Sequence, residues 1–291
     1  MDGFAEIAVF TRVVDAHSFT RAARSLGLTP SGVSRAISRL EGRLGVRLIQ
    51  RTTRSLGLTD DGAAYYARCK AILAELEDAE SSLARAGDAP HGRLRVDAPT
   101  SIGRHLIAPA LPKLLATYPE LSIDLSVRDH LIDPVAEGID VTLRMAPLRD
   151  SELVSRTLGG VRLVVAGSPR YFAKHGRPRH PSDLAAHALI GFLGGDGVVP
   201  WQFRGERSLA VTGRLHTNNA DAHREAALAG LGMIRLISLH IADDLARGRL
   251  EAVLVDHEAP PRPVYALYAR QRAALPKVRV FLDWAQSLLA A

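Results

Sequence analysis

Two features are scarce in this sequence: cysteine, which occurs once as Cys69, and long apolar runs. A single cysteine excludes an internal disulfide framework and a CxxC zinc or redox motif, so we expect a reducing compartment. No uncharged apolar stretch reaches the ~18 to 20 residues that a membrane span needs. The first residues, MDGFAE, are acidic where a signal peptide would be basic, and we therefore expect a cytoplasmic protein with no membrane partner.

Signatures of catalysis are absent as well. The sequence holds no GxSxG nucleophile elbow, no HExxH motif, no Walker loop and no GxGxxG at a strand–helix junction. His130 and the other ten histidines show no metal-ligand spacing. We therefore expect no enzyme, no cofactor and no metal site.

The length and charge of the chain indicate how many domains it has and what kind of partner it binds. A chain of 291 residues suggests two or three folded units, and 47% hydrophobic with 23% charged residues is a globular composition. The net charge is +6, of which residues 1–60 carry +4 through nine arginines against five acidic residues. A focused basic region is typical of nucleic-acid binding. Because Arg outnumbers Lys 33 to 4, a merely solvated arginine-rich surface stays open as the alternative.

The chain opens with two predicted helices. Apolar residues recur at helical spacing from Phe4 to Val14, which indicates an amphipathic helix that must pack on a partner. Ser18 is a good N-cap for a short second helix over residues 19–26, and Gly27 marks its end.

A third helix is expected from Pro30, with Thr29 as its N-cap and Gly45 as its left-handed stop. Its apolar stripe consists of Val33, Ile37, Leu40 and Leu44. Its other face is small and basic, with Ser31, Gly32, Ser34, Arg35, Ser38 and Arg39. Short hydroxylated side chains beside arginines suit a helix in the major groove, where arginine reaches base edges.

Residues 46–51 and 56–59 predict two short strands around a basic tip at 52–55. Together with the three helices they indicate a winged helix-turn-helix, whose tip would lie over the DNA backbone or minor groove. An ordinary helical hairpin beside a surface hairpin is the alternative.

At this point the sequence resembles a known family. The pattern reads SFTRAA at 18–23, Leu26, PSGVSR at 30–35, Leu40-Glu41, Leu44-Gly45, Leu48, Arg51 and Leu58-Thr59. Residues 1–59 are thus similar to the DNA-binding domain of LysR-type transcriptional regulators, apart from Ile49 in place of the usual phenylalanine. The resemblance implies that DNA is contacted by the recognition face and by the wing. The residues expected there are Ser31, Ser34, Arg35, Ser38 and Arg39 on the helix, and Arg51 and Arg54 in the wing.

Residues 60–86 predict one long linker helix with a heptad seam. The seam consists of Tyr65, Cys69, Ile72, Leu76, Ala79 and Leu83. We expect a dimer through this seam, with recognition helices about 34 Å apart. A helix lying on its own domain is the alternative, because so short a coiled coil is marginal. We interpret Cys69 as a small core residue, and a redox-sensing thiol stays the minority interpretation.

Residues 87–92 are rich in Gly and Pro and predict a hinge. After it, strands alternate with helices, which indicates α/β architecture. The expected strands are 93–98, 121–127, 139–144, 162–166, 188–192, 214–217, 233–236 and 264–269, with helices up to 117 and over 277–289.

The same family resemblance extends through residues 93–291. The segments that match the family pattern are RMAPL at 144–148, DSEL at 150–153, AGLG at 229–232, GRL at 248–250 and PKVRVF at 276–281. They imply a two-lobed, periplasmic-binding-protein-like effector domain, with lobe 1 at 93–161 plus 266–291 and lobe 2 at 162–265. Arg235-Leu236-Ile237 departs from the family, because relatives usually turn through a proline there.

We expect an effector site where Thr100 and Ser101 open a helix, because free N–H groups and the helix dipole favour an anion. A plain helix cap is the equally open alternative. Further lining candidates are Asp129, His130, Arg144, Phe192, Trp201, Thr217 and Asn218. Trp201 is expected to be a packing anchor, or else an aromatic wall.

The expected fold is therefore a winged helix-turn-helix, a linker helix and a two-lobed α/β sensor. It predicts a transcriptional regulator that binds double-stranded DNA, a small anionic or aromatic effector and itself, as a dimer or tetramer; RNA polymerase is considered as a further partner. A cytosolic small-molecule-binding protein or an architectural DNA binder without effector-dependent regulation is the alternative. Effector identity, target genes and the sign of regulation stay open.

Overall fold

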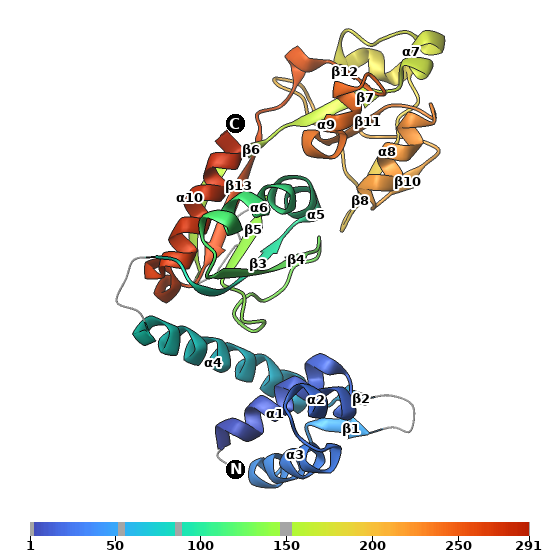
Figure 1. Cartoon of the computed structure of the whole chain (residues 1–291). Helices are drawn as coiled ribbons and strands as arrows, with labels where there is room; N and C mark the ends of the chain where they lie inside the picture. The colour runs from blue at the N-terminus through green and yellow to red at the C-terminus, as the bar shows by residue number, and fades with distance from the viewer. Residues whose placement is uncertain (1–2, 52–55, 85–88, 146–152, 291) are drawn as a thin grey trace.

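A computed structural model describes residues 3–51, 56–84, 89–145 and 153–290 of the chain. Figure 1 shows a small helical domain at one end, one long helix leading away from it, and then two α/β lobes in succession. Among the described residues, no helix is both long and apolar enough to cross a membrane.

The small domain contains three helices and a two-stranded wing. Its elements are α1 (Gly3–Ala16), α2 (Phe19–Ser25), α3 (Pro30–Leu44), β1 (Ile49–Arg51) and β2 (Leu56–Leu58). The predicted caps are confirmed: the Ser18 side chain accepts from the N–H of Arg21, and the Thr29 side chain accepts from the N–H of Gly32. Gly45 ends α3 with φ of 73°. The apolar faces of the three helices meet in a core where Phe10, Val13, Val33, Ile37 and Leu40 are fully buried.

The linker helix α4 (Asp60–Ala84) begins against the wing. Thr59 caps it by accepting a hydrogen bond from the N–H of Gly62 at 2.9 Å. The aromatic rings of Tyr65 and Tyr66 contact Phe10 of α1, and Cys69 is only 1% exposed within this single chain. The first part of α4 is therefore a wall of the small domain.

This packing divides the predicted seam into two parts. Tyr65, partly buried, and Cys69, fully buried, pack against their own domain. Their place in a dimer seam stays a prediction. Ile72 and Leu76 are 45% and 40% exposed, so both side chains are accessible to a second chain. The side chains of Ala79 and Leu83 lie outside the described part of the structure.

Lobe 1 is built on a five-stranded sheet in the order β4-β3-β5-β13-β6. Its elements are β3 (Gly92–Ala98), β4 (Leu121–Val127), β5 (Val141–Arg144), β6 (Val154–Val161), β13 (Arg262–Tyr268), α5 (Thr100–Ile102), the π-helix η1 (Gly103–Ile107), α6 (Ala108–Thr117), the 3-10 helix η4 (Arg270–Ala274) and α10 (Pro276–Ala290). Strand β3 runs parallel to β4 and β5, whereas β13 runs antiparallel to β5 and β6.

Lobe 2 contains two three-stranded sheets, β11-β7-β12 and β10-β8-β9. Its elements are β7 (Leu163–Gly167), α7 (Pro169–His175), η2 (Pro181–Ala186), β8 (Gly191–Gly194), β9 (Gly197–Val198), β10 (His216–Thr217), α8 (Ala220–Leu228), β11 (Ile234–Ile237), α9 (Ser238–Ala246), β12 (Glu251–Val253) and η3 (Val255–His257). All eight expected strands overlap an observed one. Strands β6, β9 and β12 were not predicted.

Two adjacent strands connect the lobes. The chain leaves lobe 1 after β6 and returns along β13, and these strands pair antiparallel from Arg262↔Val161 to Tyr268↔Val154 (Figure 1). The return strand joins the first sheet at Arg262, a few residues before the expected position at 266. A paired double crossing of this kind lets one lobe tilt against the other about a narrow hinge.

Candidate DNA interface and effector cleft

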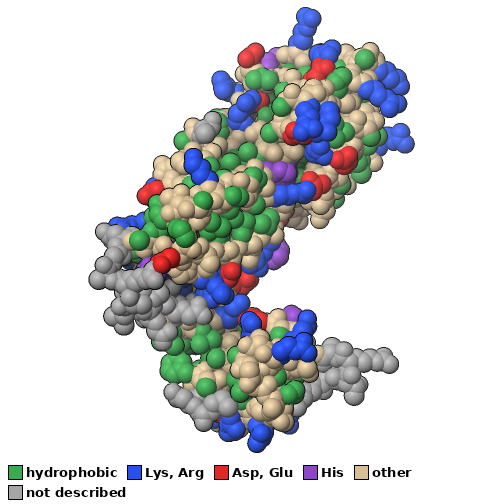
Figure 2. Space-filling model, in the orientation of Figure 1, with side chains coloured by type: hydrophobic (Ala, Val, Ile, Leu, Met, Phe, Trp, Pro, Cys, Tyr) green, Lys and Arg blue, Asp and Glu red, His purple; other side chains and the backbone are tan. Residues whose placement is uncertain are grey.

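The predicted recognition face of α3 is open to solvent. Ser31, Arg35, Ser38 and Arg39 are exposed and Ser34 is half-buried. The Nε of Arg35 donates to the backbone oxygen of Ser31 at 3.4 Å, so this side chain lies back along the helix towards its N-terminus. Figure 2 shows basic side chains at the outer edge of the small domain, where Figure 1 places α3.

A buried glutamate on α1 anchors two arginines of α3. Glu6 has a side chain 7% exposed, and its carboxylate lies 3.1 Å from Arg39 Nε and 3.5 Å from Arg43 Nη2. Both arginines remain 48% exposed, so each keeps solvent access while its direction is restrained. The sequence predicted Arg39 at the interface but did not predict its anchor, because the two partners are far apart in the chain.

The wing is described only in part. The backbone of Arg51 pairs with Leu56 in the β1–β2 ladder. The Arg51 side chain and the whole of Arg54, both predicted to contact DNA, lie outside the described residues.

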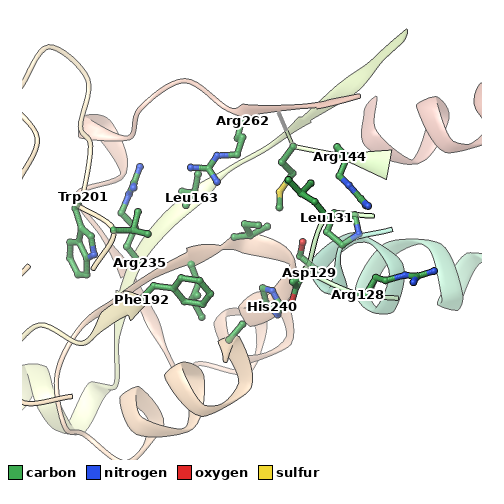
Figure 3. Close-up of a pocket in the computed structure, with 17 residues that line it drawn as sticks. Arg128, Asp129, Leu131, Arg144, Leu163, Phe192, Trp201, Arg235, His240 and Arg262 are labelled. Atoms are coloured by element: carbon green, nitrogen blue, oxygen red, sulfur yellow. The ribbon is translucent and has the colours of Figure 1, made fainter. Parts of the chain in front are cut away.

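A cavity of about 610 Å³ lies between the two lobes. Seventeen residues from both lobes line it (Figure 3). Of the predicted effector residues, the lining includes Ser101, Asp129, Arg144, Phe192 and Trp201. The others, Thr100, His130, Thr217 and Asn218, do not line this cavity, and their contact with an effector stays a prediction.

The helix start at Thr100 is not the open anion site that was expected. Pro99 occupies the N-cap position and makes no side-chain cap, so Thr100 is not the cap. The N–H of Thr100 donates to Asp129 Oδ1 at 2.9 Å, which places a carboxylate of the protein at the helix start. Ser101, 3% exposed, still reaches the cavity.

Arg144 belongs to an internal ion-pair network below the cavity. Its Nη2 lies 2.7 Å from Oδ2 of the fully buried Asp97, and Arg128 Nε donates to the other carboxylate oxygen at 2.6 Å. One carboxylate therefore holds two arginines of the cavity wall. Because Arg144 already has a carboxylate partner in Asp97, it is a restrained residue of the cavity wall.

Arg235 is one of the lining residues that the sequence did not predict. It lies on β11, is 9% exposed, and shares its side of the cavity with Arg262 of β13 (Figure 3). Burial, together with the charge of Arg262, lowers the pKa of Arg235 to about 10, and Glu258 opposes this shift. Among the described residues the Arg235 guanidinium has no hydrogen-bond partner. The sequence feature that could have pointed to Arg235 is the segment 235–237, where relatives usually have a proline.

The rest of the cavity wall is largely apolar. Phe192 and Trp201 contribute aromatic side chains, with Leu163 between the lobes. Trp201 is 2% exposed and also packs in the lobe 2 core, so it is both a packing anchor and part of the wall. Burial lowers the pKa of His240 to about 4, so this imidazole is neutral near pH 7.

These features define a class of protein: a DNA-binding regulator that carries its own ligand-sensing domain. Residues 4–63 match the model of the bacterial regulatory helix-turn-helix proteins of the lysR family, and residues 87–290 match the LysR substrate binding domain. The chain belongs to the LysR-type transcriptional regulators.

Over its whole length the chain is similar to both repressors and activators of transcription. An HTH-type transcriptional repressor of Pseudomonas aeruginosa is 36% identical, with 100% of this chain and 93% of the relative covered. The HTH-type transcriptional activator AaeR of Escherichia coli is 32% identical, with 97% and 93% covered. The structure of CrgA, a LysR-type regulator from Neisseria meningitidis, is 33% identical with a TM-score of 0.63 and covers 99% of each chain. The family, the fold class and the expectation of a non-enzymatic regulator are thereby confirmed.

Proposed function

We propose that this protein is a ligand-responsive transcriptional regulator whose effector is a small organic carboxylate with an apolar body. The observation that carries the proposal is Arg235, a buried cation in the cavity wall with no hydrogen-bond partner among the described residues. Holding a guanidinium in a largely buried position without a hydrogen-bonded counter-charge costs free energy. A bound carboxylate offsets that cost and matches the planar donor fork of arginine.

The remainder of the cavity supports an apolar or aromatic effector body. Phe192 and Trp201 offer ring faces, while Leu163 and Ile237 supply aliphatic surface. A volume of about 610 Å³ suits a ligand of modest size. Ser101 and Asp129, from lobe 1, face Arg235 and Phe192, from lobe 2, so one ligand can contact both lobes.

Contact with both lobes gives the ligand its effect on DNA binding. A ligand shifts a conformational equilibrium only by as much as it prefers one state. An effector held by Arg235 on one lobe and by Ser101 on the other favours the closed arrangement. The tilt would be passed through α4 to the spacing of two α3 helices in a dimer, with the exposed Ile72 and Leu76 at the dimer contact. A contact with RNA polymerase stays a prediction.

The first test compares carboxylates with neutral analogues. We expect aromatic and aliphatic monocarboxylates, starting with benzoate, to bind the full-length protein in calorimetry, and their primary amides, starting with benzamide, to bind far more weakly. Arg235→Gln should weaken carboxylate binding about 10- to 100-fold, because one charge-assisted contact contributes about 1.5–3 kcal/mol.

The matched control is Arg207→Gln, which removes an exposed lobe 2 arginine outside the cavity lining. It should leave carboxylate affinity unchanged. Amides that bind as tightly as acids, or full affinity in Arg235→Gln, would contradict the proposed effector class.

A further inference from the structure

Three metal-ligating side chains meet where the two lobes face each other. His105 comes from η1 of lobe 1, whereas Asp221 and His240 come from α8 and α9 of lobe 2. One ligand atom from each lies within 4.8 Å of the other two, and the two imidazole rings are 4.8 Å apart in an edge-on arrangement. The sequence showed no such site, because these residues are separated by 116 and 19 positions.

Two ring nitrogens of this cluster lack a partner. His105 Nε2 and His240 Nδ1 are shielded from solvent and have no hydrogen bond to any described residue. Buried polar atoms in proteins are normally paired, so two orphaned imidazole nitrogens at one place require an explanation. The backbone adds to the case, because His105 lies in a π-helix and such turns occur frequently at functional sites.

We propose that His105, Asp221 and His240 form a binding site for a divalent transition-metal cation such as Zn²⁺. Two imidazoles and one carboxylate are ligand types that Zn²⁺ accepts, and the hard cations Mg²⁺ and Ca²⁺ prefer all-oxygen sites. Three protein ligands leave a fourth position open, which is the arrangement of zinc sites that accept water or another ligand. Because His240 also lines the cavity, that open position lies beside the effector cleft.

The metal would hold the two lobes together. Tetrahedral Zn²⁺ with ligands at about 2.0–2.1 Å brings ligand atoms to about 3.4 Å from each other. The ligand atoms, which now lie within 4.8 Å of one another, would be held at this shorter spacing, and any contraction would draw η1 towards α8 and α9. Helix α9 already packs against α5 and η1, so the movement follows an existing contact between the lobes.

One ion pair competes with the cation. Arg104 Nη1 lies 2.5 Å from Asp221 Oδ2, but the two side chains are 58% and 47% exposed. An exposed pair of this kind is weak, and its guanidinium can turn into solvent when a doubly charged cation arrives. Removing the arginine should accordingly strengthen metal binding, which a purely structural cluster would not do.

The test is a titration of chelator-treated full-length protein with ZnCl₂ alone, without effector or DNA, in competition with a chromophoric chelator. We expect one Zn²⁺ per chain at this site. His105→Ala/His240→Ala should lose at least about 100-fold in affinity, Asp221→Asn should lose less, and Arg104→Gln should gain. Titration with CoCl₂ should give a tetrahedral visible spectrum that the double variant lacks.

The matched control is the second histidine–carboxylate cluster of the described chain, His180, Glu206 and His257, which is more exposed. His180→Ala/His257→Ala should leave the affinity of the proposed site unchanged. The proposal is overturned if His105→Ala/His240→Ala, shown to be folded by its unfolding curve, binds Zn²⁺ as wild type does. It is equally overturned if the loss occurs only in the control pair. Either failure would leave the carboxylate effector proposal intact, since no effector is present.

Discussion

At the scale of single residues, some glycines cannot be replaced because another backbone segment lies too close for a side chain. Gly62 lies in the first turn of α4, where an added Cβ would come 2.0 Å from the carbonyl oxygen of Leu48. The wing and the linker helix can approach each other only because this residue has no side chain. Gly42, inside α3, has open space around its Cα.

We expect Gly62→Ala to destabilise the DNA-binding domain by about 1–3 kcal/mol or more, because the clash is with backbone and cannot be relieved by a rotamer change. Gly42→Ala should instead stabilise by about 0.5–1 kcal/mol, since alanine is the better helix former. Urea denaturation followed by circular dichroism measures both. Equal stability of the two variants would show that α4 does not approach Leu48 this closely.

At the scale of elements, α3 is presented to DNA by the helices around it. Its apolar stripe is buried on α1 and α2, and Glu6 of α1 restrains two of its arginines. Arg35 is exposed and its Nε donates to the backbone of its own helix, so the rest of its guanidinium is available for a base edge. We expect Glu6, in contrast, to affect DNA binding only through the arginines that it positions.

We expect Arg35→Ala to weaken binding to a selected DNA site by about 1–3 kcal/mol and to reduce discrimination against random duplex. Arg207→Ala, on the far lobe, is the control. Fluorescence anisotropy over a salt series separates the lost base contact from a lost phosphate contact, because only the latter lowers affinity evenly across sequences. Unchanged selectivity would remove Arg35 from the recognition face.

At the scale of the whole molecule, α4 has two roles along its length. Its first turns complete the core of the DNA-binding domain, and its next turns expose Ile72 and Leu76. Adjacent exposed apolar side chains on a helix favour pairing with a second copy. The dimer that we propose would thus begin one or two turns beyond the domain core.

Ile72→Glu/Leu76→Glu should therefore shift the protein towards monomer in sedimentation analysis and lower its affinity for a two-half-site DNA by at least about tenfold. Val255→Glu, which replaces another exposed apolar residue on lobe 2, should change neither property. An unaltered dimer in the double variant would place the self-contact elsewhere.

The DNA-binding domain could be predicted from the sequence more fully than the two lobes could. The helices, caps and wing of the first domain follow from residues adjacent in sequence, such as Ser18, Thr29 and Gly45, and they were predicted. Strand β6 was missed because Gly159 and Gly160 weaken its strand pattern, and Gly159 is required by the approach of Leu289, where a Cβ would come within 2.8 Å. Thr100 was misassigned because the carboxylate at the helix start belongs to the distant Asp129.

By itself the sequence determined the domain order, the winged helix-turn-helix and the family, because caps, periodic apolar faces and motifs act between near neighbours. Only the tertiary structure decided which polar groups are shielded from solvent without a hydrogen-bond partner. Arg235 and the pair His105 and His240 acquire their chemistry from burial between two lobes, and burial depends on how distant segments pack. Residues that are neighbours in the sequence do not determine this packing, so the cavity and the proposed metal site could be recognised only in the fold.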